Sequence, residues 1–161
     1  MTARTSRLVA LALAATALAS CSADAAQEQQ PQAQQAPPPP VRQVVAPADV
    51  PANPNLSPGI RSGGFLFASG ALPAQSVGAD IKAQVASALN ALKAEFEAGG
   101  TSMDNVVKCT VFLTDAADFA AMNEVYVTYF PKDPPARSTV IVAALVRADA
   151  KVEIECIAAM P

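Results

Sequence analysis

The sequence predicts one small α+β domain in which a mixed β-sheet carries two helices on one face. Two observations predict this class. Apolar residues recur with a regular period only from about Ala52 onward, which marks the packed part of the 161-residue chain. Within that part, strand-like and helix-like segments follow one another in the order β-α-β-α-β-β. Residues 52–161 are therefore predicted to form a single domain.

Residues 1–20 have the organisation of a cleavable signal peptide. Met1–Arg7 carries two arginines, and Leu8–Leu18 is an apolar run that is too short to cross a bilayer comfortably. The tetrapeptide Leu-Ala-Ser-Cys, which ends at Cys21, resembles a bacterial lipobox, in which the cysteine is acylated before cleavage. We expect lipidation at Cys21 and a periplasm-facing lipoprotein, with Ser22 favouring the outer membrane. An ordinary signal peptide with a chance cysteine is the alternative.

Residues 21–51 are predicted to form a disordered tether between the lipidated cysteine and the domain. The segment is rich in Gln, Pro and Ala, so it cannot bury enough apolar area to fold. The run Pro37–Pro40 favours stiff polyproline II geometry, which suits a spacer. A recognition motif for a proline-binding partner is the alternative.

The first half of the domain is predicted to contain a strand, a long helix and a second strand. Gly64–Ser69 is a short apolar run with aromatic residues, which is typical of a strand, and a smaller strand near Ile60 can precede it. Ala79–Ala98 is predicted to be an amphipathic helix that ends at the two following glycines. Its apolar face comprises Ile81, Val85, Leu89, Leu92 and Phe96. Val106–Leu113 is rich in β-branched residues and is predicted to be the next strand.

The second half of the domain is predicted to contain one helix and two strands. The helix starts near Asp115, which can cap it, and runs to Tyr129, with Pro131 preventing its extension. Thr139–Val146 and Lys151–Met160 are predicted strands, and we expect them to pair as a hairpin. Two helices on one face leave the other face of the sheet uncovered, so we expect a closed oligomer.

The charge balance and the absence of histidine exclude several classes of function. The chain has 11 Lys and Arg residues against 14 Asp and Glu residues, and its formal net charge is −3. No basic stripe stands out, which argues against nucleic-acid binding. Without histidine, any acid–base group must be a carboxylate, Lys, Tyr, Cys or bound water. We expect no metal site.

Four separated motifs and one dipeptide carry a specific resemblance. They are Lys108–Asp115 (KCTVFLTD), Met122–Tyr126 (MNEVY), Pro135–Thr139 (PARST), Val152–Glu155 (VEIE) and Ser69-Gly70. In composition and in order they closely resemble the motifs of the RidA (YjgF) family. The likeness covers essentially all of residues 55–160.

The resemblance implies a chorismate-mutase-like fold and a homotrimer with clefts between its subunits. It also implies hydrolysis of reactive enamines and imines, such as 2-aminoacrylate, to 2-keto acids and ammonia. No cofactor is expected, because the imine carbon is already electrophilic. The expected function is therefore a hydrolytic deaminase of 2-imino acids. A trimeric binding protein for small carboxylates without turnover is the first alternative, and a structural lipoprotein of the cell envelope is the second.

Arg137 and Glu153 are the residues expected to carry the chemistry. A guanidinium can bind a carboxylate through two parallel hydrogen bonds, and the motif makes Arg137 the candidate for this role. By the same resemblance, Glu153 matches the acidic residue that positions or activates the hydrolytic water. From the residues alone, Arg137 could equally be a surface arginine at a strand start. Glu153 could equally be a solvent-facing charge, as could Glu155 on the same face.

The resemblance also implies further substrate-binding residues, namely Ser69, Gly70, Asn123, Thr139 and Leu56. Leu56 is a departure, because it stands where the family commonly carries a tyrosine. Ala71 is a second departure, because the family often has glutamine there. Both changes remove polar groups, so they predict a more apolar pocket with weaker activity on 2-aminoacrylate and a preference for bulkier imino acids.

The expected hairpin would keep Arg137 and Glu153 apart within one chain. Glu153 would lie opposite roughly residue 144, about seven positions from Arg137, which is more than about 20 Å of strand. If the two residues share a site, Arg137 must come from one subunit and Glu153 from its neighbour.

Cys109 and Cys156 remain after lipidation has used Cys21. Export would permit a disulfide between them. Both lie within predicted strands, where buried thiols behave as small apolar residues, and we expect free thiols.

Overall fold

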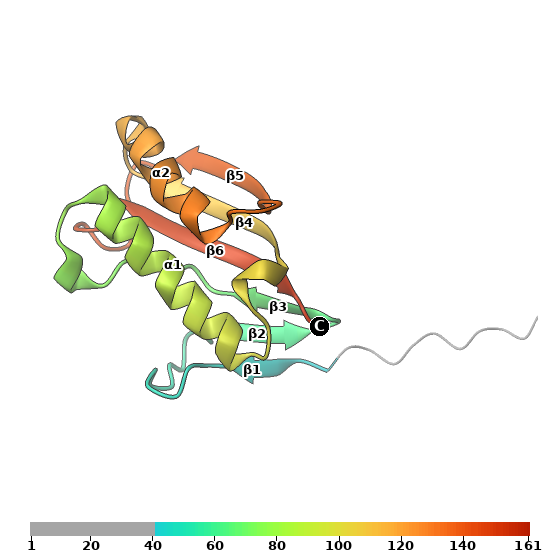
Figure 1. Cartoon of the computed structure of the whole chain (residues 1–161). Helices are drawn as coiled ribbons and strands as arrows, with labels where there is room; N and C mark the ends of the chain where they lie inside the picture. Colours follow the sequence, from blue (N-terminus) through green and yellow to red (C-terminus); the bar gives the residue numbers. More distant parts are fainter. Residues whose placement is uncertain (1–40) are drawn as a thin grey trace, which may run out of the picture. The chain divides into compact units, whose positions relative to one another are not determined.

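A computed structural model of the chain describes residues 41–161 (Figure 1). The predicted signal peptide, the lipidation site Cys21 and the tether up to residue 40 lie outside the described residues. Within residues 41–161, no helix combines the length and the apolar character needed to span a membrane.

The domain is built on a six-stranded mixed sheet with the strand order β1-β2-β3-β6-β4-β5. The strands are β1 (Gln43–Val45), β2 (Gly59–Ser62), β3 (Phe65–Ala68), β4 (Val106–Leu113), β5 (Ala136–Ile141) and β6 (Val152–Ala159). β4 and β5 are parallel, and the other neighbouring pairs are antiparallel. The parallel pair is possible because a helix crosses over between its two strands. The predicted α+β class is confirmed.

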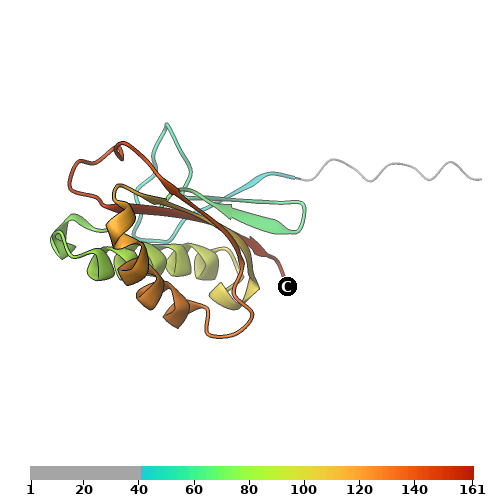
Figure 2. The same ribbon diagram turned by 90° about the horizontal axis from the view of Figure 1, so that it is seen from above.

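The two long helices lie on the same face of the sheet (Figure 2). They are α1 (Ile81–Ala98) and α2 (Phe119–Tyr129), and short 3-10 turns occur at η1 (Gln75–Val77), η2 (Met103–Asn105) and η3 (Ala116–Asp118). Asp80 caps α1, because its carboxylate accepts hydrogen bonds from two backbone N–H groups of the first turn. Asp115 accepts a similar bond at the start of η3, which leads into α2. Both predicted helices are therefore confirmed.

The hydrophobic core lies between the helices and one face of the sheet. Along β6 the residues alternate, with Val152, Ile154, Cys156 and Ala158 buried in the core. The face of α1 that packs against them comprises Val85, Ala88, Leu89, Leu92 and Phe96, all fully buried. The intervening residues of β6 point to the opposite face of the sheet.

That opposite face, called the open face below, is not covered by a helix among the described residues (Figure 2). Phe65, Phe67 and Val140 project from it and remain 40%, 44% and 41% exposed. Half-exposed apolar side chains on an uncovered sheet face are typical of a surface that another protein molecule covers.

The predicted hairpin of residues 139–146 with residues 151–160 is wrong. β5 covers Ala136–Ile141 and pairs with β4, whereas β6 pairs with β3 on one side and β4 on the other. Because β3 and β4 occupy both edges of β6, β5 does not pair with β6, and it joins the sheet at the free edge of β4. Residues 142–151 therefore form a connection across β4 instead of a tight turn.

The folded part also begins earlier than Ala52. β1 (Gln43–Val45) lies within the predicted tether and pairs with β2, with Val44 opposite Ile60. Val45 is 8% exposed and belongs to the core. Three residues beside a proline-rich segment give no periodic signal, so the sequence pattern does not reveal this strand.

Cys109 and Cys156 form a disulfide, so the expectation of free thiols is wrong. The two residues are direct partners in the β4–β6 ladder, and both are buried in the core. Facing residues on neighbouring strands lie close enough for such a bond.

Candidate active site

Arg137 lies on β5, and its side chain contacts α2. Its Nη2 donates a hydrogen bond of 2.7 Å to Oδ1 of Asn123, and its Nη1 lies 3.9 Å from the sulfur of Met122. The guanidinium carbon is 4.5 Å from the ring centroid of Tyr126 and 5.9 Å from that of Phe119. The contacts with Asn123 and Tyr126 together fix the position and the plane of the guanidinium.

The guanidinium of Arg137 retains hydrogen-bond donors for a ligand. It has five N–H donors in a planar fork. Within residues 41–161, the structure records hydrogen bonds from it only to Asn123 and Met122. Arg137 is half-buried, so the fork is held firmly but is not enclosed. A carboxylate is the group that matches the geometry of such a fork best.

Tyr126 and Thr139 each place a buried hydroxyl group near the helix side of β5. Burial raises the pKa of Tyr126 to about 12, and the positive charge of Arg137 opposes part of that rise, so the phenol stays neutral. Thr139 lies two residues beyond Arg137 on the same face of β5. Its Oγ1 and the Tyr126 hydroxyl have no hydrogen-bond partner among the described residues. A buried hydroxyl group without a hydrogen-bond partner lowers the stability of the fold unless another molecule supplies that partner.

Glu153 lies on β6, and its carboxylate packs directly against the backbone of Gly70. A Cβ atom at position 70 would overlap Oε1 of Glu153, so the contact requires glycine. Ala71 and Ile154 hold the two segments together through N–H···O bonds of 2.8 and 3.1 Å, one in each direction. The position of the carboxylate is therefore defined by the backbone on both sides.

Ser69 joins this group to the connection between β1 and β2. Its N–H donates to the carbonyl of Pro58 and its Oγ donates to the carbonyl of Ser57, both at 2.7 Å. Leu56 immediately precedes Ser57 and is 53% exposed. Leu56 thus presents an apolar surface to solvent one residue from the partner of Ser69.

The predicted site residues form two separate groups. Arg137, Asn123 and Thr139 gather on the helix side of the sheet, and Ser69, Gly70 and Glu153 gather on the open side. The hairpin that suggested a separation is absent, but the structure keeps the groups apart for a different reason, which is the alternation of side chains along the strands. That the two groups meet between subunits stays a prediction.

The chemistry available to these groups is hydrogen bonding and proton transfer. Within residues 41–161, no group of three or more His, Cys, Asp or Glu side chains is arranged to hold a metal ion. A guanidinium, a carboxylate, an amide and several hydroxyl groups remain. They suit the binding of a small carboxylate and the handling of a water molecule.

Two features of this region were not predicted from the residues. The stacking of Arg137 on Tyr126 depends on how α2 crosses β5, and no sequence pattern reports that crossing. The second feature is Gln84, which is 1% exposed on the buried face of α1. A glutamine on the apolar face of a predicted helix is the signal that could have identified it, since buried polar groups require partners.

Comparison with known proteins places the domain among related sequences. The profile of the family described as Endoribonuclease L-PSP matches residues 44–160. A RutC family protein of Pyrococcus horikoshii is 45% identical over 107 residues, which are 63% of this chain and 84% of that protein. Reactive Intermediate Deaminase A of Arabidopsis thaliana chloroplasts is 39% identical over 109 residues, which are 65% of this chain and 58% of that protein.

Solved structures show the same fold. A Rid-family protein of Yersinia pestis, described as being of unknown function, has a TM-score of 0.69 and 36% identity over 74% of this chain and 100% of that chain. The yeast protein YEO7 has a TM-score of 0.70 and 33% identity over 75% of this chain and 100% of that chain. The profile match, these relatives and the fold agree, and the chain therefore belongs to the endoribonuclease L-PSP family, which is also called the RidA or YjgF family.

Proposed function

We propose that the chain hydrolyses 2-imino acids, and the enamines that interconvert with them, to 2-keto acids and ammonia. The observation that carries the proposal is the guanidinium of Arg137, which Asn123 and Tyr126 hold in place with donors left over for a carboxylate. A deaminase role is supported by the plant relative named Reactive Intermediate Deaminase A.

In the proposed reaction, Arg137 binds the substrate carboxylate and so places the adjacent imine carbon. Glu153 takes a proton from a water molecule while the water oxygen forms a bond to that carbon. The second electron pair of the C=N bond passes to the nitrogen, which takes this proton from Glu153. The C–N single bond then breaks as the new hydroxyl group gives up its own proton to the nitrogen, which leaves as ammonia. The water oxygen becomes the keto oxygen, and no substrate atom is oxidised or reduced.

We also propose that the chain works as a homotrimer in which each site combines two protomers. One protomer supplies the Arg137 group and its neighbour supplies the Glu153 group. Members of the family are typically homotrimers that bind small molecules. The exposed Phe65 and Phe67 on the open face support an interface there, since their burial would stabilise the assembly.

We propose that the chain is exported and anchored by a lipid on Cys21. The tetrapeptide that ends at Cys21 supports this, and so does the disulfide between Cys109 and Cys156, because disulfides persist mainly in oxidising compartments. Mass spectrometry of the membrane-extracted protein should find an acylated N-terminal Cys21, and Cys21→Ala should release or stall the protein. A mature N-terminus at another residue, or an absent acyl mass, would exclude the anchor.

A binding protein without turnover is the second candidate. Leu56 favours it, because its side chain cannot orient a substrate or a water molecule through a hydrogen bond, whereas Ala71 is buried in the core and does not bear on the choice. Cleavage of RNA, which the family description suggests, is disfavoured by the net charge of −3 and by the lack of histidine.

Imine hydrolysis by the full chain distinguishes these functions. An amino-acid oxidase generates imines in situ, and their decay is followed with and without the protein. We expect faster decay, which Arg137→Ala and Glu153→Gln abolish. Glu155→Gln is the matched control, because Glu155 lies on the same strand and face, and it should retain activity. Binding of 2-keto acids without faster decay would support the second candidate, and cleavage of a test RNA would contradict both.

A further inference from the structure

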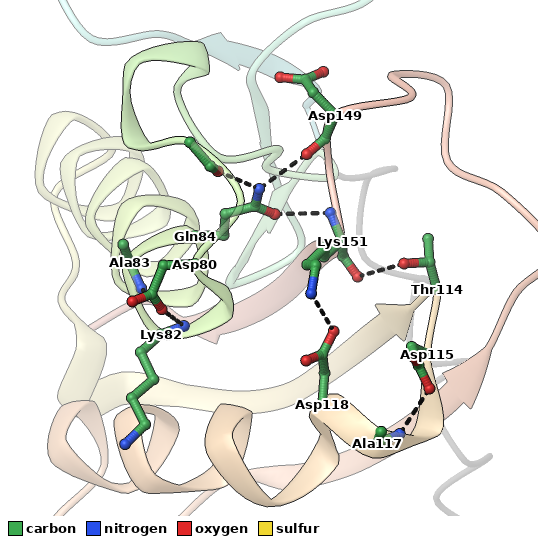
Figure 3. Close-up of polar contacts among 11 residues, drawn as sticks. Asp80, Lys82, Ala83, Gln84, Thr114, Asp115, Ala117, Asp118, Asp149 and Lys151 are labelled. Atoms are coloured by element: carbon green, nitrogen blue, oxygen red, sulfur yellow. Dashed lines mark hydrogen bonds and ion pairs between the residues drawn. The ribbon is translucent and has the colours of Figure 1, made fainter.

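Gln84 is the most deeply buried polar side chain of the domain as far as the structure describes it, at 1% exposed. Its amide makes three hydrogen bonds, all to backbone groups. Nε2 donates to the carbonyls of Gly78 at 2.6 Å and Asp149 at 2.9 Å, and Oε1 accepts from the N–H of Lys151 at 2.7 Å. Figure 3 shows the side chain between these segments.

The segments that Gln84 joins are the two that carry the contact between Gly70 and Glu153. Gly78 follows η1 in the connection that runs from Gly70 to α1. Lys151 stands immediately before β6, two residues ahead of Glu153. The amide of Gln84 therefore links Gly78, which follows Gly70 along the chain, to Lys151, which precedes Glu153. Gly70 and Glu153 themselves are in contact at the candidate site.

Lys151 is held on its other sides as well. Its carbonyl accepts from the N–H of Thr114 at 3.0 Å. Its Nζ lies 3.2 Å from Oδ2 of Asp118 at the start of α2 (Figure 3). Lys151, the residue before β6, is thus held by contacts with α1, with the end of β4 and with the start of α2. Among these contacts, the bonds of Gln84 alone reach the loop that comes from Gly70.

We propose that Gln84 is a positioning residue that sets where the Glu153 carboxylate stands against Gly70, an inference that rests on the proposed role of Glu153 in hydrolysis. Gln84 does not touch the site, and it acts through the backbone of Gly78, Asp149 and Lys151. A small displacement of the Glu153 carboxylate, which is proposed to activate the water, slows the chemical step. It does not weaken the hydrogen bonds between Arg137 and the substrate carboxylate.

A graded series of variants tests this role. Gln84→Glu, neutral when buried, keeps the acceptor for Lys151 and one donor, whereas Gln84→Leu keeps no hydrogen bond. We expect kcat for imine hydrolysis to fall by about tenfold or more in Gln84→Leu and by less in Gln84→Glu, with KM changed by less than about twofold in both. The affinity for the product 2-keto acid should likewise stay unchanged.

Leu89→Ala is the matched control. Leu89 lies fully buried on the same helix face and makes none of these bonds, so its truncation lowers stability without releasing β6. An equal loss of kcat per folded trimer in Gln84→Leu and Leu89→Ala would overturn the proposal. If Gln84→Leu does not fold, the kcat of Gln84→Glu decides by the same comparison.

The proposal remains testable if the wild-type chain hydrolyses no imine, a result that would end the proposed function. The side-chain carboxyl 13C resonance of Glu153, assigned with Glu153→Gln, should then shift in Gln84→Glu and stay in place in Leu89→Ala. An unmoved resonance in Gln84→Glu would remove Gln84 from any positioning role.

Discussion

Arg137 and Glu153 project from opposite faces of the sheet, on the two strands that flank β4. Arg137 is paired with Cys109 of β4, and Glu153 is paired with Phe112. Paired residues point to the same face, and residues 109 and 112 are an odd number of positions apart, so their side chains point to opposite faces. One protomer therefore presents two half-sites on opposite faces, which the proposed trimer would join into one site between neighbouring protomers.

The half-site around Arg137 should bind carboxylates independently of catalysis. Arg137→Ala removes a charge-assisted pair of hydrogen bonds worth about 1.5–3 kcal/mol, so the affinity for a 2-keto acid should fall at least about tenfold. Arg137→Lys should not restore it, because the planar fork is lost. Titration calorimetry measures both, with the exposed Arg61→Ala as control. A folded Arg137→Ala protein with wild-type affinity would remove Arg137 from the site.

Leu56 should make the site prefer bulky apolar imino acids. The prediction is tested with imines made in situ from Ala, Leu, Met and Phe, whose decay is compared. The rates should favour the larger members, and Leu56→Tyr should shift the preference toward the smallest one by restoring a hydroxyl group. A strong preference of the wild-type chain for the smallest imine would refute the apolar pocket.

The disulfide between Cys109 and Cys156 should contribute a large part of the stability. It closes a loop with a sequence separation of 47 residues, for which chain entropy gives about 4 kcal/mol. Reduction should therefore lower the unfolding midpoint in urea, and reductant should have no effect on the double variant Cys109→Ala/Cys156→Ala. Equal midpoints for the oxidised and reduced wild-type protein would show that the cross-link is not stabilising.

Glu95 on α1 should make stability depend on pH. Its Oε2 is buried without a partner among the described residues, and burial raises the pKa of Glu95 from 4.5 to about 7. The folded chain thus holds this proton more tightly than the unfolded chain. The contribution of Glu95 to the free energy of unfolding is fully present below about pH 4.5 and is lost as the pH rises through about 7. The loss amounts to about 1–2 kcal/mol after allowance for solvent screening.

Denaturant unfolding of Glu95→Gln against the wild-type chain isolates that effect. The difference in unfolding free energy between the two proteins should change over this pH range, whereas the exposed Glu97→Gln should track the wild-type chain throughout. A pH-independent difference for Glu95→Gln would show that this carboxyl does not titrate as described.

The sequence pattern predicted the elements that depend on local periodicity. α1 follows from the spacing of its buried face between Ile81 and Phe96, and β4 follows from its β-branched residues. The position of β5 does not follow from such a pattern, because any apolar run can pair at more than one edge. Its place beside β4 is decided by the occupancy of both edges of β6, a property of the whole sheet.

The same limit applies to the contacts of the site. The motifs pointed to Arg137 and Glu153, but their placement on opposite faces depends on registers that the sequence does not report. The disulfide depends on the register that places Cys109 opposite Cys156. The role of Gln84 depends on backbone groups distant along the chain, and its only local sign is a polar residue on an apolar helix face.

The most direct test of the shared site is complementation between two inactive variants. Arg137→Ala protomers retain Glu153, and Glu153→Gln protomers retain Arg137, so a mixed trimer can assemble one intact site between neighbours. Refolding the two variants together at equal amounts should restore about a quarter of wild-type imine hydrolysis, because about three quarters of random trimers are mixed and each has one intact site of three. Light scattering should report trimers throughout. Mixed trimers without any hydrolysis, while the wild-type chain is active, would contradict a site built from Arg137 of one protomer and Glu153 of the next.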